Sequence, residues 1–220
     1  MNYTTLNTLI QQYTENYETS FVANIPVFVQ QAEQRIYNSV QFPSLRKNVT
    51  GVVSSTSPYL SAPSDYLASY SLAVIDADGN YEFLLNKDVN FIRQAYPKSS
   101  DTGLPRYYAL FGAQTNAPDE LSFMLGPKPD ATYRVELHYF FYPESISVAP
   151  DGQTWLGDNF DSVLLYGSLV EAYAYMKGDA ETMNVYNQKF MEALALAKRL
   201  GDGMERQDAY RSGQFRQKVT

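Results

Sequence analysis

The stretch "LLYGSLVEAYAYMKGDAETM", residues 164–183, is central to the fold prediction because it predicts two helices that pack against each other. Its apolar residues recur every three or four positions, which is the spacing of one face of an α-helix. Gly167 and its small neighbours keep one side of the first helix narrow, so a partner helix can approach closely. Gly178 suits the left-handed position that closes a helix, and Asp179 is placed to cap the next one. We therefore expect an αα-hairpin.

The residues that flank this stretch predict the limits of the hairpin. Asp158 is placed to cap the first helix, and the helical spacing of the second helix continues to Leu200. Gly201 and Gly203 then predict the end of the second helix, since glycine is enriched just past helix ends. The predicted hairpin therefore lies within residues 151–200.

Residues 1–44 predict two more helices. Thr4 or Thr5 is placed to cap the first helix, whose apolar residues share one face. Asn24, two residues before Pro26, predicts the start of the second helix, because proline is tolerated in the first helical turn. The apolar stripe of this second helix continues until Pro43 ends it.

Between residues 45 and 150 the apolar period changes to two, which is the period of a β-strand. The clearest strand covers residues 132–141, and its expected hairpin partner is 121–125. A second hairpin joins residues 70–75 to 81–85 across a turn rich in Asp, Gly and Asn. Further strands are expected at 49–53, 59–61 and 106–111, and a brief helix at 88–95. The chain is therefore predicted to be α+β, with an antiparallel β-domain inserted between helical segments.

Residues 201–220 predict an extended C-terminal arm whose charge is opposite in sign to that of the chain. The formal net charge is -7, yet no acidic residue occurs from Ala209 onward. Such a reversal suggests a partner with an acidic groove, and the alternative is a frayed terminus without function. The arm residues that carry the first interpretation are Arg206, Tyr210, Arg211, Phe215, Arg216 and Lys218.

The composition excludes several classes of function. The 220 residues are 45% hydrophobic and 19% charged, which is ordinary for a globular protein. No apolar stretch reaches the roughly 20 residues that a membrane span needs. The absence of cysteine excludes disulfides and thiolate metal sites, and the negative charge argues against a general nucleic-acid binder. The unusual feature is the aromatic content, 19 Tyr and 12 Phe, because tyrosine is favoured in protein–protein interfaces and also in β cores.

Side chains that could carry chemistry are few. Asp76, Asp78 and Asn80 match alternate positions of a calcium loop, but Tyr81 stands where that loop needs glycine. His138 lies among polar residues of its strand, where a cross-strand contact is expected in place of catalysis. Nothing places two carboxylates across a cleft, as a glycosidase requires. We therefore expect no enzyme activity, no catalytic residue, no cofactor and no metal.

Several segments follow one another in a particular order along the chain. They are a two-helix start, "LSAPSDYLASYSL" (60–72), "GLPRYYALFG" (103–112), "LSFMLGPKPDATYRVELHYFFYP" (121–143), and "TWLGDNFDSVLLYGSLVEAYAYMKGD" (154–179) with a following "YNQKFMEAL" helix. In this order the chain resembles the head-to-tail adaptor (connector) proteins of tailed bacteriophages. The resemblance covers most of residues 1–200.

The resemblance implies a domain organisation that agrees with the predicted elements. Residues 1–44 would supply the N-terminal helices of a helical core, and 151–200 the αα-hairpin that completes it. Residues 45–150 would form the inserted β-domain, and 201–220 the extended C-terminal arm.

The resemblance also implies a structural role in the virion. We expect a dodecameric ring of this chain, docked beneath the portal protein at the capsid vertex and followed by a tail or nozzle protein. The arm would reach into clefts between portal subunits. The genomic DNA would pass through the ring without specific binding, because acidic walls repel phosphates. The expected location is the head–tail interface, after assembly in the host cytoplasm and without membrane contact.

Two other functions remain as alternatives. The chain could be a different neck or tail-completion protein, which keeps the virion location and changes the neighbours. Alternatively, the β-domain could bind or cleave glycans during host attachment, and aromatic platforms on that domain would favour this function.

Overall fold

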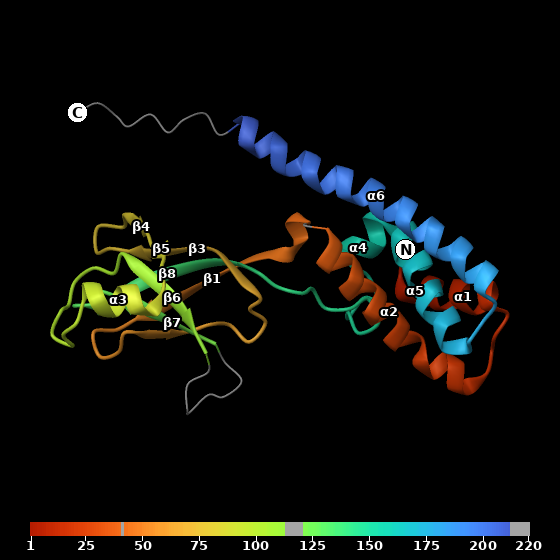
Figure 1. Ribbon diagram of the computed structural model, residues 1–220, viewed down its shortest axis with the longest axis horizontal. Helices are drawn as coiled ribbons and strands as arrows, with labels where there is room; N and C mark the ends of the chain where they lie inside the picture. Colours follow the sequence, from red (N-terminus) through yellow and green to blue (C-terminus); the bar gives the residue numbers. More distant parts are fainter. Residues whose placement is uncertain (41, 113–120, 212–220) are drawn as a thin grey trace. The chain divides into compact units, whose positions relative to one another are not determined.

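The structure is a computed structural model that describes residues 1–40, 42–112 and 121–211, with the backbone alone at residue 43 and at 201–211 (Figure 1). The described residues form an α+β fold with six α-helices and two β-sheets, as the sequence predicts. They divide into two compact units. The helical unit combines Met1–Leu45 with the described chain from Pro143 onward, and the β unit is Arg46–Tyr142.

The helical unit is built around α5 (Asp161–Met176). This helix packs against α1 (Tyr3–Thr14), α2 (Thr19–Ser39), α4 (Trp155–Asn159) and α6 (Ala180–Arg211). Its buried residues are Val163, Leu164, Gly167, Ser168, Leu169, Val170 and Ala172. They lie on more than one side of the helix, which is typical of a helix enclosed by its neighbours. Segments from both halves of the sequence therefore complete one core.

The start of each N-terminal helix differs from the prediction. Asn2 caps α1, since its side chain accepts a hydrogen bond from the Thr5 backbone N–H at 2.9 Å. Helix α2 begins at Thr19 and contains Pro26 in its interior. Phe21 explains the early start, because it is buried and its ring lies 6.3 Å from that of Tyr175 in α5 and 5.7 Å from that of Phe28. This packing outweighs the hydrogen bond that proline removes.

The predicted αα-hairpin is present, but its caps are partly different. Asp158 lies inside the short helix α4, so it does not cap α5. The left-handed residue that closes α5 is Lys177, with φ of 54°, and not Gly178. A Cβ on Gly178 would lie 2.6 Å from a ring carbon of Tyr173, so a close contact explains this glycine. Asp179 accepts from the Thr182 backbone N–H at 3.0 Å, which confirms the predicted cap of α6.

Helix α6 is longer than predicted. It continues through Gly201 and Gly203 to Arg211, so the expectation that these glycines end it is wrong. Each glycine inside a helix costs about 1 kcal/mol relative to alanine. Strong helix formers, among them Met204, Glu205 and Arg206, follow the glycines and favour continuation of the helix.

The described residues of the β unit form two four-stranded sheets. One sheet has the order β1-β8-β3-β4 and the other β2-β7-β6-β5. The strands of the first are β1 (Arg46–Val53), β8 (Tyr133–Phe140), β3 (Ala68–Ile75) and β4 (Tyr81–Phe83). Those of the second are β2 (Tyr59–Ser61), β7 (Ser122–Gly126), β6 (Tyr107–Phe111) and β5 (Leu85–Asn86). The short helices η1 (Pro43–Leu45) and α3 (Val89–Ala95) complete the order of elements.

One predicted hairpin is confirmed and the other is wrong. β3 pairs with β4 across the turn at Asp76–Asn80, as expected. β7 and β8 do not pair with each other, because they belong to different sheets. Every residue of β7 is buried, so this strand is central in its own sheet, between β2 and β6. The β unit is also not purely antiparallel, since β5 pairs with β6 in parallel.

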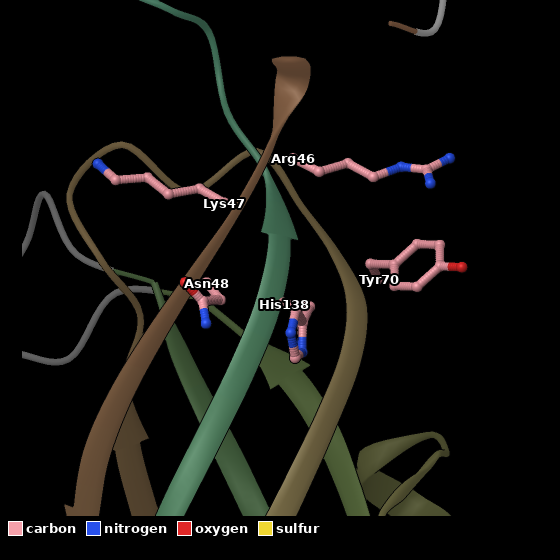
Figure 2. Close-up of a pocket in the computed structure, with 5 residues that line it drawn as sticks. All are labelled: Arg46, Lys47, Asn48, Tyr70 and His138. Atoms are coloured by element: carbon pink, nitrogen blue, oxygen red, sulfur yellow. The ribbon is translucent and has the colours of Figure 1, made fainter. Parts of the chain in front are cut away.

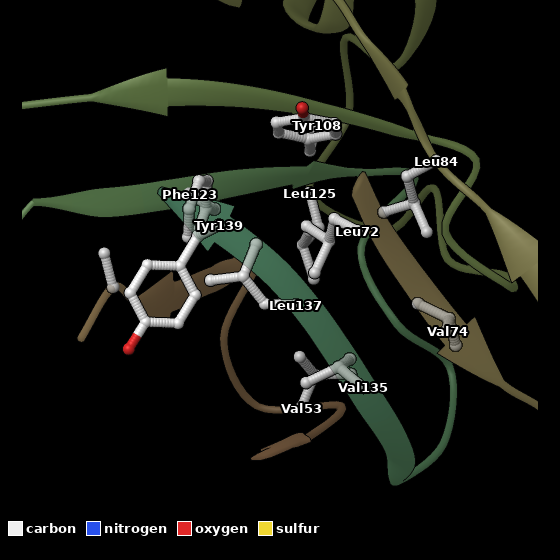
Figure 3. Packing of buried hydrophobic residues seen from close by; sticks show 11 residues of the cluster. Val53, Leu72, Val74, Leu84, Tyr108, Phe123, Leu125, Val135, Leu137 and Tyr139 are labelled. Carbon is white, nitrogen blue, oxygen red and sulfur yellow. The ribbon is translucent and has the colours of Figure 1, made fainter. Parts of the chain in front are cut away.

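The core of the β unit lies between the two sheets (Figure 3). β8 alternates between partly exposed residues and buried ones, namely Val135, Leu137 and Tyr139, as its period predicts. These three side chains meet Phe123 and Leu125 of the other sheet. The core residues labelled in Figure 3 are Val53, Leu72, Val74, Leu84, Tyr108, Phe123, Leu125, Val135, Leu137 and Tyr139.

Candidate interaction surfaces

The contact between α5 and α6 depends on a small residue, as the sequence predicts. A Cβ on Gly167 would lie 3.0 Å from Phe190 of α6 and 3.2 Å from Ala32 of α2. Arg35 of α2 joins the same three helices, since it lies 3.5 Å from Glu171 of α5 and 4.9 Å from the ring centroid of Phe190. The three helices therefore form a close-packed group.

Four tyrosines gather where α1, α5 and α6 meet. The ring of Tyr186 lies 5.0 Å from that of Tyr173 and 6.4 Å from those of Tyr13 and Tyr166. Burial, followed by the neighbouring tyrosines, raises the pKa of Tyr186 to about 12. Two tyrosines of the opening stretch, Tyr166 and Tyr173, thus pack within the chain.

A third tyrosine of this stretch is half exposed. Tyr175 packs against Phe21 and Phe28 of α2 at 6.3 and 5.1 Å, yet 49% of its surface is exposed. On α6, Val185, Leu196 and Leu200 are also exposed. The helical unit therefore presents large apolar side chains from two helices to its surroundings.

A buried carboxyl group fixes the segment that leads into α4. Glu33 of α2 is only 3% exposed and accepts from the Ile146 backbone N–H at 3.0 Å. Burial raises the pKa of Glu33, and its hydrogen bonds to Ile146 and Ser145 oppose that rise. Burial, together with the nearby Glu33 carboxylate, also raises the pKa of Tyr37. This segment is thereby held to α2 by a polar contact inside the core.

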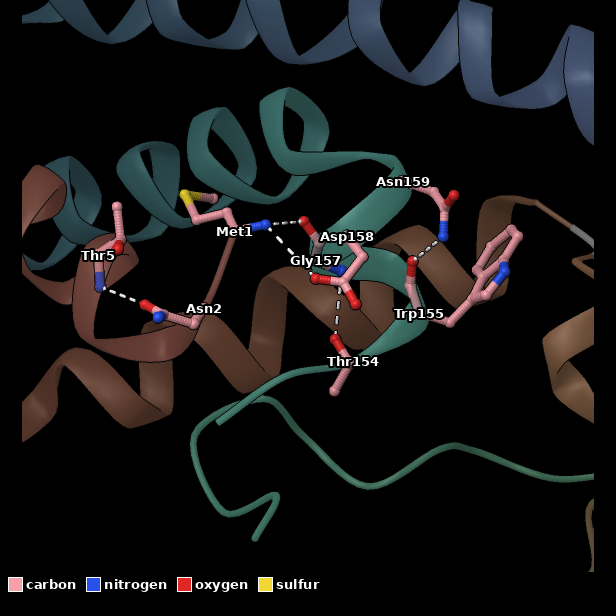
Figure 4. A network of polar contacts seen from close by, with 8 residues as sticks. All are labelled: Met1, Asn2, Thr5, Thr154, Trp155, Gly157, Asp158 and Asn159. Carbon is pink, nitrogen blue, oxygen red and sulfur yellow. Dashed lines mark hydrogen bonds and ion pairs between the residues drawn. The ribbon is translucent and has the colours of Figure 1, made fainter. Parts of the chain in front are cut away.

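The start of the chain contacts α4 (Figure 4). The amino group of Met1 donates to the Gly157 carbonyl at 2.7 Å and lies 3.6 Å from the Asp158 carboxylate. The Gly157 backbone N–H donates to Thr154 Oγ1 at 3.2 Å. A Cβ on Gly157 would lie 2.7 Å from the Met1 carbonyl oxygen, so glycine allows this close approach.

On the β unit, five side chains line a shallow pocket: Arg46, Lys47, Asn48, Tyr70 and His138 (Figure 2). Arg46 lies 4.8 Å from the ring centroid of Tyr70 and 5.6 Å from that of Phe140, which are cation–π distances. Lys47 forms an ion pair of 2.7 Å with Asp65, and this bond holds the pKa of Asp65 below its usual range. This cluster could not be found from the sequence. The pairing of β1 and β3 with β8, together with a β-bulge near Tyr70, brings its residues together.

The side chains considered for chemistry take structural roles. Asp76 accepts hydrogen bonds from the backbone N–H groups of Asp78 and Asn80, which is the behaviour of a hairpin turn. His138 contacts Ser71 of β3 at 3.4 Å, which is the predicted cross-strand contact, and it also lies 3.4 Å from Glu136 of its own strand. Among the described residues, no group of His, Asp and Glu is arranged to hold a metal. None of the described helices has both the length and the apolar character of a membrane span.

The structure describes three of the six predicted arm residues. Arg206, Tyr210 and Arg211 lie on the backbone of α6 and not on an extended segment. Phe215, Arg216 and Lys218 lie outside the described residues.

Together, the fold and these surfaces define an α+β protein of two compact units, each with exposed large apolar and aromatic side chains. The family model of the SU10 adaptor protein matches residues 1–217. The chain therefore belongs to the SU10 adaptor protein family, which makes it a structural adaptor protein of phages and confirms the resemblance to head-to-tail adaptors. The comparison with curated proteins gives no match.

Proposed function

We propose that this chain forms a dodecameric ring in the virion that joins the portal protein at the capsid vertex to the tail. The observation that carries the proposal is the family match over residues 1–217. A helical unit assembled from both sides of an inserted β unit supports it, because this is the organisation that the resemblance implies. Assembly takes place in the host cytoplasm, and the finished ring lies at the head–tail interface.

Within the ring we assign a role to each part of the chain. The helical core of residues 1–44 and 151–200 forms the rigid body, and the β-domain of residues 45–150 faces further copies or the tail or nozzle protein. Helix α6 has 32 residues, so at about 1.5 Å per residue it is roughly 48 Å long. A helix of this length is stiff enough to form the first part of the arm, through Arg211, and to carry residues 212–220.

The charge of the helical unit fits a channel through which DNA passes. Residues 1–45 and 143–200 contain eleven acidic and five basic residues. A negative wall repels the phosphates of the genome and keeps it from adhering during passage. The ring surrounds the DNA without binding it specifically.

The arm residues Arg206, Tyr210, Arg211, Phe215, Arg216 and Lys218 bind the portal in this proposal. Ordering a chain segment costs about 1–2 kcal/mol per residue in backbone entropy. The helical backbone through Arg211 reduces this cost, because that part of the arm is already ordered. Aromatic anchors and basic side chains that meet acidic portal groups offset the remainder, and repetition around the ring multiplies weak contacts.

The experiment is to mix the purified chain with portal rings of the same phage and to image the product. We expect a second ring stacked on the portal. A truncation after Arg211 keeps α6 intact and removes Phe215, Arg216 and Lys218, so it should fold and fail to stack. Lys198→Glu serves as the control, since it reverses an exposed charge on α6 outside the arm.

Full stacking by the truncated chain would refute the arm assignment. Stacking on another neck component in preference to the portal would favour a different neck or tail-completion protein.

A further inference from the structure

Strand β1 is one edge of its sheet, and its outward backbone groups can be identified. The Phe140 carbonyl accepts from the Leu67 backbone N–H, so at Phe140 the backbone of β8 points toward β3 and away from β1. In antiparallel pairs the direction alternates with every residue. Arg46 lies opposite Phe140, so the backbone groups of Arg46 point away from β8, toward the outside of the sheet. Every second residue of β1 after Arg46 has the same direction, and these residues are Asn48, Thr50 and Val52. Among the described residues, none outside β1 forms a backbone hydrogen bond with these three.

Strand β4 is the opposite edge of the same sheet. The Leu84 backbone N–H donates to the Leu72 carbonyl, so at Leu72 the backbone of β3 points toward β4. By the same alternation, Val74 and Glu82 exchange hydrogen bonds, whereas Tyr81 and Phe83 turn their backbone groups outward. Both edges therefore present backbone donors and acceptors that no other described residue uses.

The side chains of the two edges lie in the same register rows, project from the same face of the sheet, and are chemically suited to pair. The register runs from Val52 through Arg134 and Ile75 to Tyr81, so Val52 and Tyr81 occupy one row on one face of the sheet. Thr50 and Phe83 share the next row in the same way. Val52, Tyr81 and Phe83 are 60%, 53% and 63% exposed, so these apolar side chains are accessible to a partner strand. Pairs of β-branched and aromatic residues are favourable across neighbouring strands.

We propose that β1 of one copy pairs in antiparallel fashion with β4 of a second copy of this chain, with Val52 opposite Tyr81 and Thr50 opposite Phe83. The strand directions permit this pairing. Within one sheet β4 runs antiparallel to β1, so a second copy in the same orientation places its β4 antiparallel to β1 of the first copy. The charges also permit it: Thr50, Gly51 and Val52 carry no charge, and Glu82 is the only charged residue of β4 opposite them. Residues 48–53 contain neither charge nor proline, so the edge lacks the usual protection against pairing.

The contact uses different surfaces on the two copies, so it repeats from copy to copy and can close into a ring. It would give the β units a continuous sheet across each subunit boundary. This inference rests on the ring of the proposed function and specifies where neighbouring copies touch.

Cysteine cross-linking tests the pairing, because the natural chain contains no cysteine. The Cα atoms of a hydrogen-bonded antiparallel pair lie about 5.5 Å apart, within the range of about 4.4–6.8 Å that a disulfide spans. The variant that carries Val52→Cys and Tyr81→Cys should give a ladder of covalent oligomers when it is oxidised on portal rings or at high concentration. In the control, Val52→Cys is combined with Glu82→Cys, which projects to the other face of the sheet, and no ladder is expected.

A proline pair provides a second test that does not depend on oxidation. Thr50→Pro removes an outward N–H, so the variant should fold and associate at least about tenfold more weakly. Gly51→Pro removes an N–H that faces β8, so it should destabilise the β unit itself. Rings that form without the cross-link, or with Thr50→Pro at unchanged affinity, would overturn this inference and leave the proposed function intact. Absence of any ring, with or without portal, would count against both.

Discussion

Gly167 lies where α5 touches both α2 and α6, so it tests how closely the helices are packed. Gly167→Val would place methyl groups against Phe190 and Ala32, where even a Cβ is 3.0–3.2 Å away. We expect the free energy of unfolding to fall by about 1–3 kcal/mol, measured by urea denaturation. Gly112→Val is the control, because a Cβ on Gly112 would meet no atom of the described residues within 4 Å. Equal stability of the two variants would contradict the close packing of the three helices.

Tyr186 predicts a dependence of stability on alkaline pH. Burial and its tyrosine neighbours raise the pKa of Tyr186 to about 12, so the folded state resists ionisation of this residue. Its contribution to stability is complete below the ordinary pKa of 10.0 and is lost as pH rises toward 12. Tyr186→Phe should therefore lose less stability than the natural chain over this range, in urea denaturation at a series of pH values. Identical slopes would show that the cluster does not perturb Tyr186.

At the scale of elements, variants of Gly201 and Gly203 can distinguish whether these glycines lie inside α6 or end it. Gly201→Ala combined with Gly203→Ala should raise the helical circular dichroism signal, with a gain of up to about 1 kcal/mol for each glycine. The reason is that both glycines lie inside α6. If they ended the helix in a left-handed conformation instead, alanine would lower the helical signal and the stability.

The elements themselves were largely predictable, and their partners were not. The αα-hairpin, the β3–β4 hairpin and the strand at 133–140 follow from periodicity, because burial of one face leaves a repeat in the sequence. The separation of β7 from β8 does not, since a short turn-rich connection between two strands favours a hairpin. The early start of α2 was not predictable for the same reason. The packing of Phe21 that stabilises it involves Tyr175, which is distant in the sequence.

The candidate surfaces were less predictable than the fold. The basic and aromatic arm residues could be chosen from composition alone, and they remain a prediction. The pocket of Arg46, Tyr70 and His138 could not be found, since these residues come from three strands that only the register brings together. The two sheet edges were equally hidden, because edge position depends on strand order.

At the scale of the whole molecule, we expect the isolated protein to be folded and mostly monomeric at micromolar concentration. Its exposed apolar side chains are dispersed among charges, whereas obligate oligomers bury larger apolar interfaces. Portal rings would raise the local concentration and so promote contacts between neighbouring copies. Light scattering tests this, and a stable dodecamer in the absence of portal would contradict it.

The helical unit has a consequence for the timing of folding during synthesis. Helices α1 and α2 leave the ribosome first, but their central partner α5 begins only at Asp161. The β unit, which is contiguous from Arg46 to Tyr142, is translated in full before α5 and can fold while α1 and α2 still wait. The rigid core therefore comes into existence only late in translation, so a nascent chain cannot join an assembly before most of it has been made.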